Sequence, residues 1–198
     1  MRDAPLFFLR HGETYFNAEG RIQGQLDTPL SPIGRDQAAE AGRALESLFM
    51  GAGLDLPATP WCVSPLSRAT DTATIARDAA GLPGAGFVTD ARLMELNFGV
   101  WQNMTWPEIR GREPGAVSAR QSDVWNFTPP GGESYAALTT RVAAWLEERN
   151  GTTVVVAHGG VARALMVLIG GVAPAEACKA PVYQGRVLAF SSGKGSWA

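Results

Sequence analysis

The sequence predicts an α/β fold built around a mostly parallel sheet. Short apolar runs end in small-residue turns, and each turn leads into a segment with helical periodicity. No internal repeat or low-complexity tract interrupts this pattern. With 198 residues, the chain has the usual length of one domain and can bury a substantial core. We therefore expect residues 1–198 to form a single domain.

The individual elements follow from the apolar patterns and from the residues that bound them. The expected strands are residues 6–9, 61–63, 152–157, 182–183 and 186–190. The expected helices are residues 32–51, 64–80, 134–149 and 161–169. We expect Ser31 and Ser64 to cap the first two helices, because serine is favoured at the N-cap and a proline follows each of them.

Residues 97–132 show neither the apolar period of a helix nor that of a strand. The segment contains four prolines and three of the six tryptophans, Trp101, Trp106 and Trp125. Two interpretations are open: a long loop packed on the core, or a partly ordered cap whose aromatic side chains form the wall of a pocket. We favour the cap-like insertion.

Charge and composition exclude several classes of protein. The 17 Lys and Arg residues nearly balance the 19 Asp and Glu residues, so no broad basic face is expected for nucleic acid or an anionic membrane. Cys62 and Cys178 form neither a disulfide framework nor a zinc motif, which favours the reduced cytosol. The N-terminal apolar run is too short for a signal peptide, and no run approaches the ~18 residues of a membrane span. We expect a cytoplasmic protein.

The two histidines occupy equivalent positions in the predicted fold. His11 and His158 each follow an apolar run that is expected to be a buried strand, and each precedes a glycine. Ligands bind where the carboxyl ends of parallel strands meet, so we expect both side chains to share a site. A single histidine is more often structural than catalytic, and the repeated context therefore carries the inference.

The residues around the histidines indicate an anion. Arg10 precedes one histidine, and Arg68 falls in the first turn of the second expected helix. A buried guanidinium needs an anionic partner, which favours bidentate binding of phosphate or carboxylate. Gly159–Gly160 would begin a helix whose free N–H groups point to the same place. For Arg68 a surface position, paired with Asp71 or Asp78, remains the alternative.

Among the possible chemistries, phosphoryl transfer to a histidine fits these residues best. A metal site is disfavoured, because arginines beside the two histidines would repel a cation. The sequence motifs of nucleotide-binding loops and of serine hydrolases are absent. Nearby arginines favour the neutral imidazole that a nucleophile requires, and they stabilise the transferring oxygens. No metal and no cofactor is needed for this reaction.

A general acid must protonate the leaving alkoxide. Glu95 is the best candidate, because it lies between apolar neighbours directly before the aromatic segment. An exposed glutamate at a strand edge is the alternative interpretation of the same residue.

Five segments carry motifs that occur in this order in one known family. They are LRHGET at 9–14 with Asn17 and Gln23 behind it, SPLSRATDTA at 64–73, ELNFGVW at 95–101, PGGES at 130–134 and VAHGGVAR at 156–163. This ordered set resembles the histidine phosphatase superfamily, in the branch of the cofactor-dependent phosphoglycerate mutases and small phosphatases. The resemblance covers about residues 6–165.

The resemblance implies a role for each candidate residue. His11 would be the nucleophile that accepts the phosphate, and Glu95 the proton donor. Phosphate or substrate would be bound by Arg10, Asn17, Gln23, Arg68, His158 and Gly159. The resemblance also implies a three-layer α/β/α sandwich, and metal-independent hydrolysis of a small phosphorylated metabolite through a phosphohistidine intermediate.

The chain departs from the family pattern at Gln102 and Asn103, where many of the phosphatases carry Glu-Gly. One carboxylate near the pocket is therefore missing, and the acid role is left to Glu95 alone. The cap is shorter than in the glycolytic mutases, which favours a phosphatase. A mutase and a non-catalytic module that binds a phosphorylated ligand are the alternatives.

Overall fold

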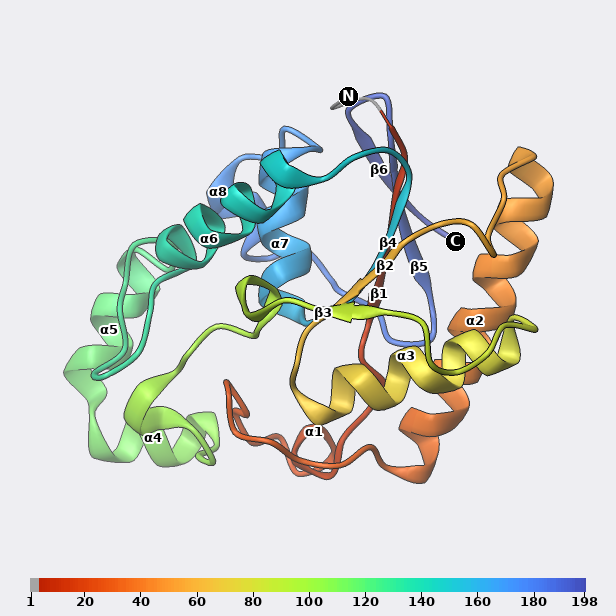
Figure 1. Cartoon of the computed structure of the whole chain (residues 1–198). Helices are drawn as coiled ribbons and strands as arrows, with labels where there is room; N and C mark the ends of the chain where they lie inside the picture. The colour runs from red at the N-terminus through yellow and green to blue at the C-terminus, as the bar shows by residue number, and fades with distance from the viewer. Residues whose placement is uncertain (1–3) are drawn as a thin grey trace.

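The computed structural model describes residues 4–198, and its centre is a six-stranded sheet with helices on both faces (Figure 1). The strand order is β3-β2-β4-β1-β5-β6. The strands are β1 (Leu6–Arg10), β2 (Trp61–Val63), β3 (Val88–Thr89), β4 (Thr153–Ala157), β5 (Val187–Ser191) and β6 (Lys194–Trp197). Strands β1 to β4 pair in parallel, whereas β5 and β6 are antiparallel to their neighbours. This mostly parallel α/β/α architecture confirms the predicted fold class.

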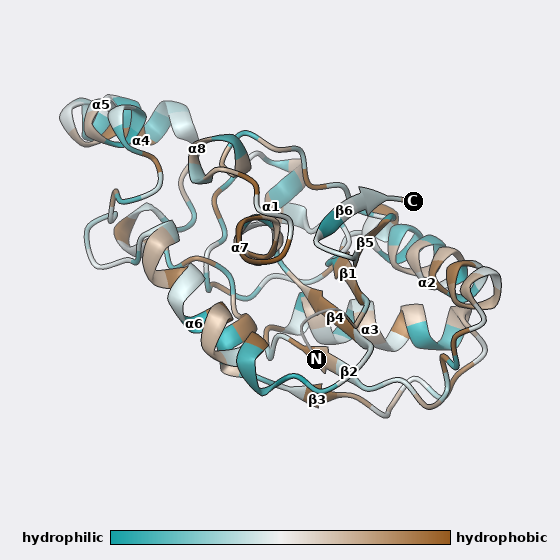
Figure 2. Ribbon diagram, turned by 90° about the horizontal axis from the view of Figure 1, so that it is seen from above, coloured by the Kyte–Doolittle hydropathy of each residue, from teal (hydrophilic) through white to brown (hydrophobic). Residues whose placement is uncertain are grey.

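Eight α-helices and two short 3-10 helices complete the described chain. They are α1 (Tyr15–Ala18), α2 (Pro32–Ala52), α3 (Ser67–Ala79), η1 (Ala91–Leu93), η2 (Gly99–Trp101), α4 (Trp106–Arg112), α5 (Pro114–Ser122), α6 (Tyr135–Glu148), α7 (Gly159–Leu168) and α8 (Pro174–Ala177). Helices α2 and α3 cover one face of the sheet, and α6 and α7 cover the other (Figures 1 and 2). None of these helices is both long and apolar enough to cross a membrane.

The central strands are apolar throughout because helices cover both of their faces. In β1, Phe7 and Leu9 pack towards α2 and α3, whereas Leu6 and Phe8 pack towards α6 and α7. Helix α7 is apolar on most of its circumference, as its hydrophobic colour in Figure 2 shows, and seven of its ten residues are buried. The rigid core thus holds the carboxyl ends of β1 and β4, which carry the histidines.

The first expected cap is confirmed and the second is wrong. The Ser31 hydroxyl accepts a hydrogen bond from the Gly34 N–H at 3.1 Å and starts α2. Ser64 does not cap α3, which begins only at Ser67. The Asp27 carboxylate, 40 positions away in the chain, accepts hydrogen bonds from the N–H and the hydroxyl of Ser67 instead.

The expected strand at residues 182–183 is also wrong. Strand β5 pairs instead with β6, which follows it after a two-residue turn at Ser192 and Gly193. Both turn residues have positive φ, at 50° and 72°, as hairpins of this length require. The strand that forms a hairpin with β5 thus follows it in the chain, and residues 182–183 lie in the loop before it.

Residues 97–132 are more helical than expected. They contain η2, α4 and α5, which enclose a small separate core around Trp101, Ile109 and Val117. Helices of seven and nine residues are too short for a clear apolar period. The capping box of Thr105 and Glu108, however, was visible in the sequence and marks the start of α4. In Figures 1 and 2, α4 and α5 lie at the end of the molecule away from α2.

Candidate active site

The structure places the two histidines side by side. Strands β1 and β4 are adjacent and parallel, with Arg10 opposite Ala157, so the residue that follows each strand comes to the same edge of the sheet. The ring centroids of His11 and His158 are 5.1 Å apart. One edge of the sheet therefore presents both imidazoles to one site.

His11 is held in a single protonation form by its neighbours. Its Nδ1 lies 2.7 Å from the carbonyl oxygen of Gly12. A carbonyl only accepts, so Nδ1 carries the proton and Nε2 keeps its lone pair. Burial holds the pKa of His11 well below its usual value, and the positive charges of Arg68 and Arg10 lower this pKa further. The ring is therefore neutral at pH 7, with Nε2 able to act as a nucleophile.

His158 lies beside the His11 ring, is fully buried and is not among the side chains that line the pocket. Its Nε2 is 2.7 Å from the Ser64 hydroxyl, and its Nδ1 has no hydrogen-bond partner within the described chain. Burial holds the pKa of His158 well below its usual value, and Arg68 and then His11 add to this shift. Ser64 thus orients the second imidazole rather than capping a helix.

Two arginines beside the histidines are held by backbone carbonyls. The buried Arg68 donates from Nη2 to Gly24 at 2.7 Å and from Nη1 to Leu26 at 2.8 Å. Arg10 donates from Nη1 to Val182 at 2.8 Å. Their Nε atoms are buried without a partner in the described chain. Carbonyl partners fix both guanidiniums without neutralising them, and Arg68 is not the exposed residue of the alternative interpretation.

Glu95 lies in the loop between η1 and η2 and is only partly exposed, so it is not the glutamate of a strand edge. Its Oε1 accepts hydrogen bonds from Gly160 N–H at 3.0 Å and from Leu96 N–H at 2.8 Å. The expectation that the first N–H groups of α7 are free is therefore wrong for Gly160. The side chain of Glu95 therefore contacts the first turn of α7.

The two glycines that start α7 leave the space that the charged groups occupy. A Cβ at Gly159 would lie 3.3 Å from Arg163 Nη1 and 3.9 Å from Glu95 Oε2. A Cβ at Gly160 would overlap Glu95 Oε1. Gly159 is not part of the pocket lining, but its lack of a side chain lets these groups come together around it.

Asn17 and Gln23 line the pocket with the charged residues. The Asn17 side-chain oxygen accepts from the Thr14 N–H at 3.2 Å, and that of Gln23 accepts from the Thr28 hydroxyl at 2.6 Å. Because both oxygens are engaged, the NH₂ groups are the parts of these amides that remain available to a ligand.

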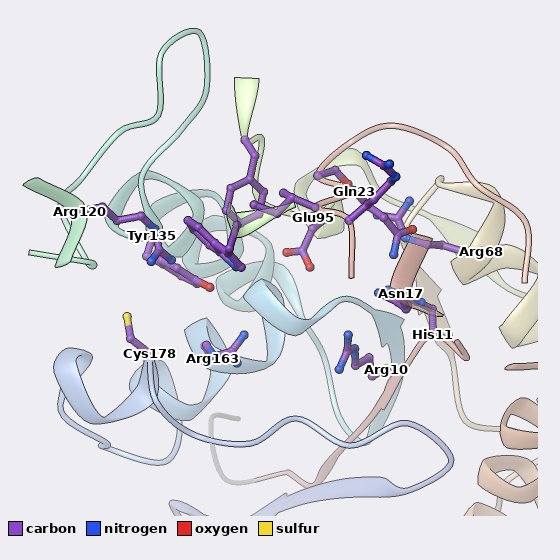
Figure 3. A pocket seen from close by; sticks show the side chains of 15 residues that line it. Arg10, His11, Asn17, Gln23, Arg68, Glu95, Arg120, Tyr135, Arg163 and Cys178 are labelled. Atoms are coloured by element: carbon purple, nitrogen blue, oxygen red, sulfur yellow. The ribbon is translucent and has the colours of Figure 1, made fainter. Parts of the chain in front are cut away.

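These residues surround a pocket of about 380 Å³, shown in Figure 3. Several side chains in its wall were not among the site residues predicted from the sequence, namely Arg21, Ile22, Phe98, Arg120, Tyr135, Arg163 and Cys178. Of the three tryptophans, Trp106 lines the pocket, Trp101 fills the small core and Trp125 stacks on Tyr135. Arg163 ends the VAHGGVAR motif and could have been noticed there, whereas nothing local marked Arg120.

Gln102, where many of the phosphatases carry Glu, supports the loop that holds Arg68. Its Oε1 accepts from Gln25 N–H at 2.6 Å, and the flanking Gly24 and Leu26 supply the carbonyls that bind Arg68. Gln25 in turn donates from Nε2 to the Glu95 carbonyl at 3.1 Å. One side chain thus connects the loop, the arginine and the candidate acid.

Replacing Gln102 by alanine should therefore weaken anion binding. Loss of one such hydrogen bond predicts an inhibition constant for inorganic phosphate that is about 3- to 10-fold higher, with a smaller change in kcat. Gln102→Glu keeps the acceptor and should restore most of the affinity. Gln121→Ala, an exposed change on α5, is the control. An unchanged phosphate constant in Gln102→Ala would show that the loop does not depend on this side chain.

The two neutral histidines also predict acid sensitivity of the fold. The unfolded chain binds a proton at each histidine below about pH 6.5, whereas the folded chain does not. Stability therefore falls with pH below 6.5, because the unfolded state takes up more protons. We expect the free energy of unfolding to drop by roughly 2–3 kcal/mol between pH 7 and 5.5.

Urea denaturation at both pH values measures this loss. The His11→Asn variant should show about half of the loss, since one of the two groups is removed. An equal unfolding free energy at pH 7 and 5.5 in the wild-type protein would contradict the neutral, buried state of the histidines.

Positive charge at the pocket comes from arginine side chains. Within residues 4–198, no group of three His, Cys, Asp or Glu side chains is placed to hold a metal ion. Two neutral imidazoles, two arginines without carboxylate partners and a carboxylate at a helix N-terminus define a site for transferring a phosphoryl group.

The chain belongs to the histidine phosphatase superfamily (branch 1), whose sequence profile matches residues 6–198. It is 36% identical over 186 residues to the glucosyl-3-phosphoglycerate phosphatase of Mycolicibacterium vanbaalenii, covering 86% of this chain and 76% of that protein. It is 35% identical over 172 residues to the metal-independent phosphoserine phosphatase of Arabidopsis thaliana, covering 83% of this chain and 68% of that protein.

A solved structure shares the fold. The mycobacterial glucosyl-3-phosphoglycerate phosphatase in complex with VO₃ superposes with a TM-score of 0.77 at 31% identity, covering 98% of this chain and 96% of that one. Other relatives carry the name probable phosphoglycerate mutase. Together, the family and the phosphatase relatives make the chain a phosphatase of this superfamily.

Proposed function

We propose that the chain hydrolyses a small phosphate monoester without a metal, through a phosphohistidine formed on Nε2 of His11. One observation carries this proposal. The hydrogen bond from Nδ1 to the Gly12 carbonyl leaves the Nε2 lone pair free, beside two arginines that no carboxylate neutralises. Such a group is prepared to attack phosphorus.

In the first step, Nε2 attacks the phosphorus atom while the bond from phosphorus to the leaving oxygen breaks. Arg10 and Arg68 stabilise the charge on the three other oxygens. The unpartnered Nδ1 of His158, buried beside the His11 ring and outside the pocket lining, is proposed as a further donor once the phosphate is seated against that ring. The amide NH₂ groups of Asn17 and Gln23 are the further contacts, whereas Gly159, outside the pocket lining, contributes the space that its missing side chain leaves. Glu95, as the carboxylic acid, gives its proton to the leaving oxygen, so a neutral alcohol departs.

In the second step, water attacks the phosphohistidine from the side the alcohol has left. Glu95, now a carboxylate, takes a proton from this water as the bond from phosphorus to nitrogen breaks. Inorganic phosphate and neutral His11 are the products. The same carboxylate thus serves as acid and then as base.

Residues 97–132 are proposed to act as a cap on a single domain. Their Phe98, Trp106 and Arg120 form part of the pocket wall, which supports a role in selecting the alcohol part of the substrate. A place in the cytoplasm is part of the proposal, because a chain with two scattered cysteines has no need of an oxidising compartment. A small phosphorylated metabolite is the substrate class that fits a pocket of this size.

Phosphate release measured with p-nitrophenyl phosphate, in buffer containing EDTA, tests this function. We expect full activity after chelation, because arginines supply the positive charge. Complete loss that Mg²⁺ or Zn²⁺ restores would contradict the mechanism. The second candidate, a mutase, is tested with 3-phosphoglycerate with and without 2,3-bisphosphoglycerate. Primer-dependent isomerisation without phosphate release would favour the mutase.

A further inference from the structure

We propose a second anion-binding subsite in the same pocket, formed by Arg120 and Arg163, for an anionic group on the leaving alcohol. This inference rests on the proposed phosphatase function and defines its substrate class more closely. The substrate would be a phosphate monoester that carries a carboxylate, or a second phosphate, close to the ester.

The pocket has two differently composed ends. In Figure 3, His11, Asn17 and Arg68 lie at one end, Arg120 and Arg163 lie at the other, and the Glu95 carboxylate lies between them. Arg163 comes from α7 and Arg120 from α5, at the end of residues 97–132 that faces the pocket. A substrate with its phosphate at His11 therefore extends its alcohol part past Glu95 towards these arginines.

Neither arginine is satisfied within the described chain. Arg163 donates from Nη2 to the Ala180 carbonyl at 3.2 Å, and its Nε is buried without a partner. The Arg120 guanidinium stacks on the Trp106 ring, 4.8 Å from the centroid. No carboxylate of residues 4–198 lies within 4 Å of either one. Both guanidiniums are thus held in place by neutral groups, with their charge available to a ligand.

Their surroundings make an unpaired charge costly. Burial lowers the pKa of Arg120, and the positive charge of Arg163 lowers it further. Tyr135, buried against both arginines, and Cys178 are neutral at pH 7, because burial raises the pKa of each. Two neighbouring cations among neutral groups therefore gain most from binding an anion.

The charge of the pocket also exceeds what one phosphate can balance. Four wall arginines lack a carboxylate partner, and the wall contains one carboxylate. The four are Arg10, Arg68, Arg120 and Arg163, and the carboxylate is Glu95. A fifth wall arginine, Arg21, is paired with Glu19 and Glu108. With neutral histidines, the four unpaired arginines and Glu95 have a net charge of +3 when Glu95 is ionised and +4 when it is protonated. A phosphate monoester dianion balances two of these positive charges, so a further negative group on the substrate is favoured.

The spacing indicates a small substrate. The position of a Cβ on Gly159 is 3.3 Å from Arg163 Nη1 and 4.0 Å from Arg10 Nε, so the two arginines approach one another there. An anionic group only a few bonds from the phosphate ester can therefore reach Arg163 while the phosphate remains at His11. A three-carbon acid has this reach.

The test compares two substrates that differ in one group, 3-phosphoglycerate and glycerol 3-phosphate. We expect the wild-type protein to prefer the carboxylate by at least about 10-fold in kcat/KM, the strength of one charge-assisted contact. In Arg120→Gln this preference should fall to about 2-fold. Arg110→Gln, an exposed arginine of the same cap outside the pocket, is the matched control and should retain the preference.

Further variants and substrates distinguish a failure of the subsite proposal from a failure of the proposed function. Arg163→Gln should also reduce the preference, whereas an equal loss for both substrates would place Arg163 at the transferring phosphate and overturn its role in the subsite. A second pair of substrates, the monophosphate and the bisphosphate of 1,3-propanediol, is compared in the same way. A larger preference in this pair than in the first would show that a second phosphate is favoured over a carboxylate. Turnover of p-nitrophenyl phosphate with no preference in either pair overturns the subsite alone. No turnover of any substrate overturns the proposed function.

Discussion

Substitution of His11 by asparagine is expected to lower kcat by more than about 10⁴-fold, which is the largest effect that any single change should have. The variant loses the ring nitrogen that is placed to accept the phosphoryl group, and the neighbouring His158 cannot replace it because its Nε2 is bonded to Ser64. Asparagine keeps a side chain that can bond to the Gly12 carbonyl, so the fold should survive. Phosphate release at saturating substrate measures the loss.

Two controls accompany this variant. Circular dichroism and the thermal midpoint show that it is folded at pH 7.5. His158→Asn should be less damaging, with a loss of about 10²- to 10³-fold in kcat, because it removes a donor to the phosphoryl oxygens and not the nucleophile. If His11→Asn retained turnover within tenfold of wild type, the role of His11 would be wrong.

Glu95→Gln is expected to have the second largest effect, and this effect should depend on the leaving group. Glutamine has the same shape and can accept the N–H of Gly160, but it cannot supply a proton to the departing oxygen. For an alkyl ester such as glycerol 3-phosphate, kcat should fall by about 10²- to 10⁴-fold.

The nitrophenolate ion leaves without protonation, so formation of the intermediate from p-nitrophenyl phosphate should be much less affected. A burst of nitrophenol followed by slow turnover is expected, since the second step still needs a base. Equal losses for both substrates in the first step would show that Glu95 is not the acid. Gly160→Ala, which displaces the carboxylate, should resemble Glu95→Gln with the alkyl ester.

Most of the fold and the centre of the site could be predicted from the sequence because the signals are local. Strands β1 and β4 end directly before His11 and His158, so the place of each histidine follows from its own strand. Because parallel neighbouring strands have their carboxyl ends at one edge, the two rings had to approach one another.

The features that could not be predicted depend on contacts between distant segments. The Ser64-Pro sequence is typical of a helix cap, yet the hydroxyl bonds to His158, and the remote Asp27 starts α3. Arg120 enters the pocket because the short helices α4 and α5 pack around Trp101, and no period in the sequence indicates that arrangement. Likewise, nothing local shows that Glu95 and the first turn of α7 would meet.

The central claim is that phosphate is carried on His11, and trapping that intermediate tests it most directly. The enzyme is mixed with ³²P-labelled substrate, quenched in alkali within milliseconds and digested, and the labelled peptide is located. We predict an alkali-stable, acid-labile label on the peptide containing His11, joined through Nε2 and absent from His11→Asn. Rapid turnover with no label on the protein, or with a label on any other residue, would contradict the mechanism.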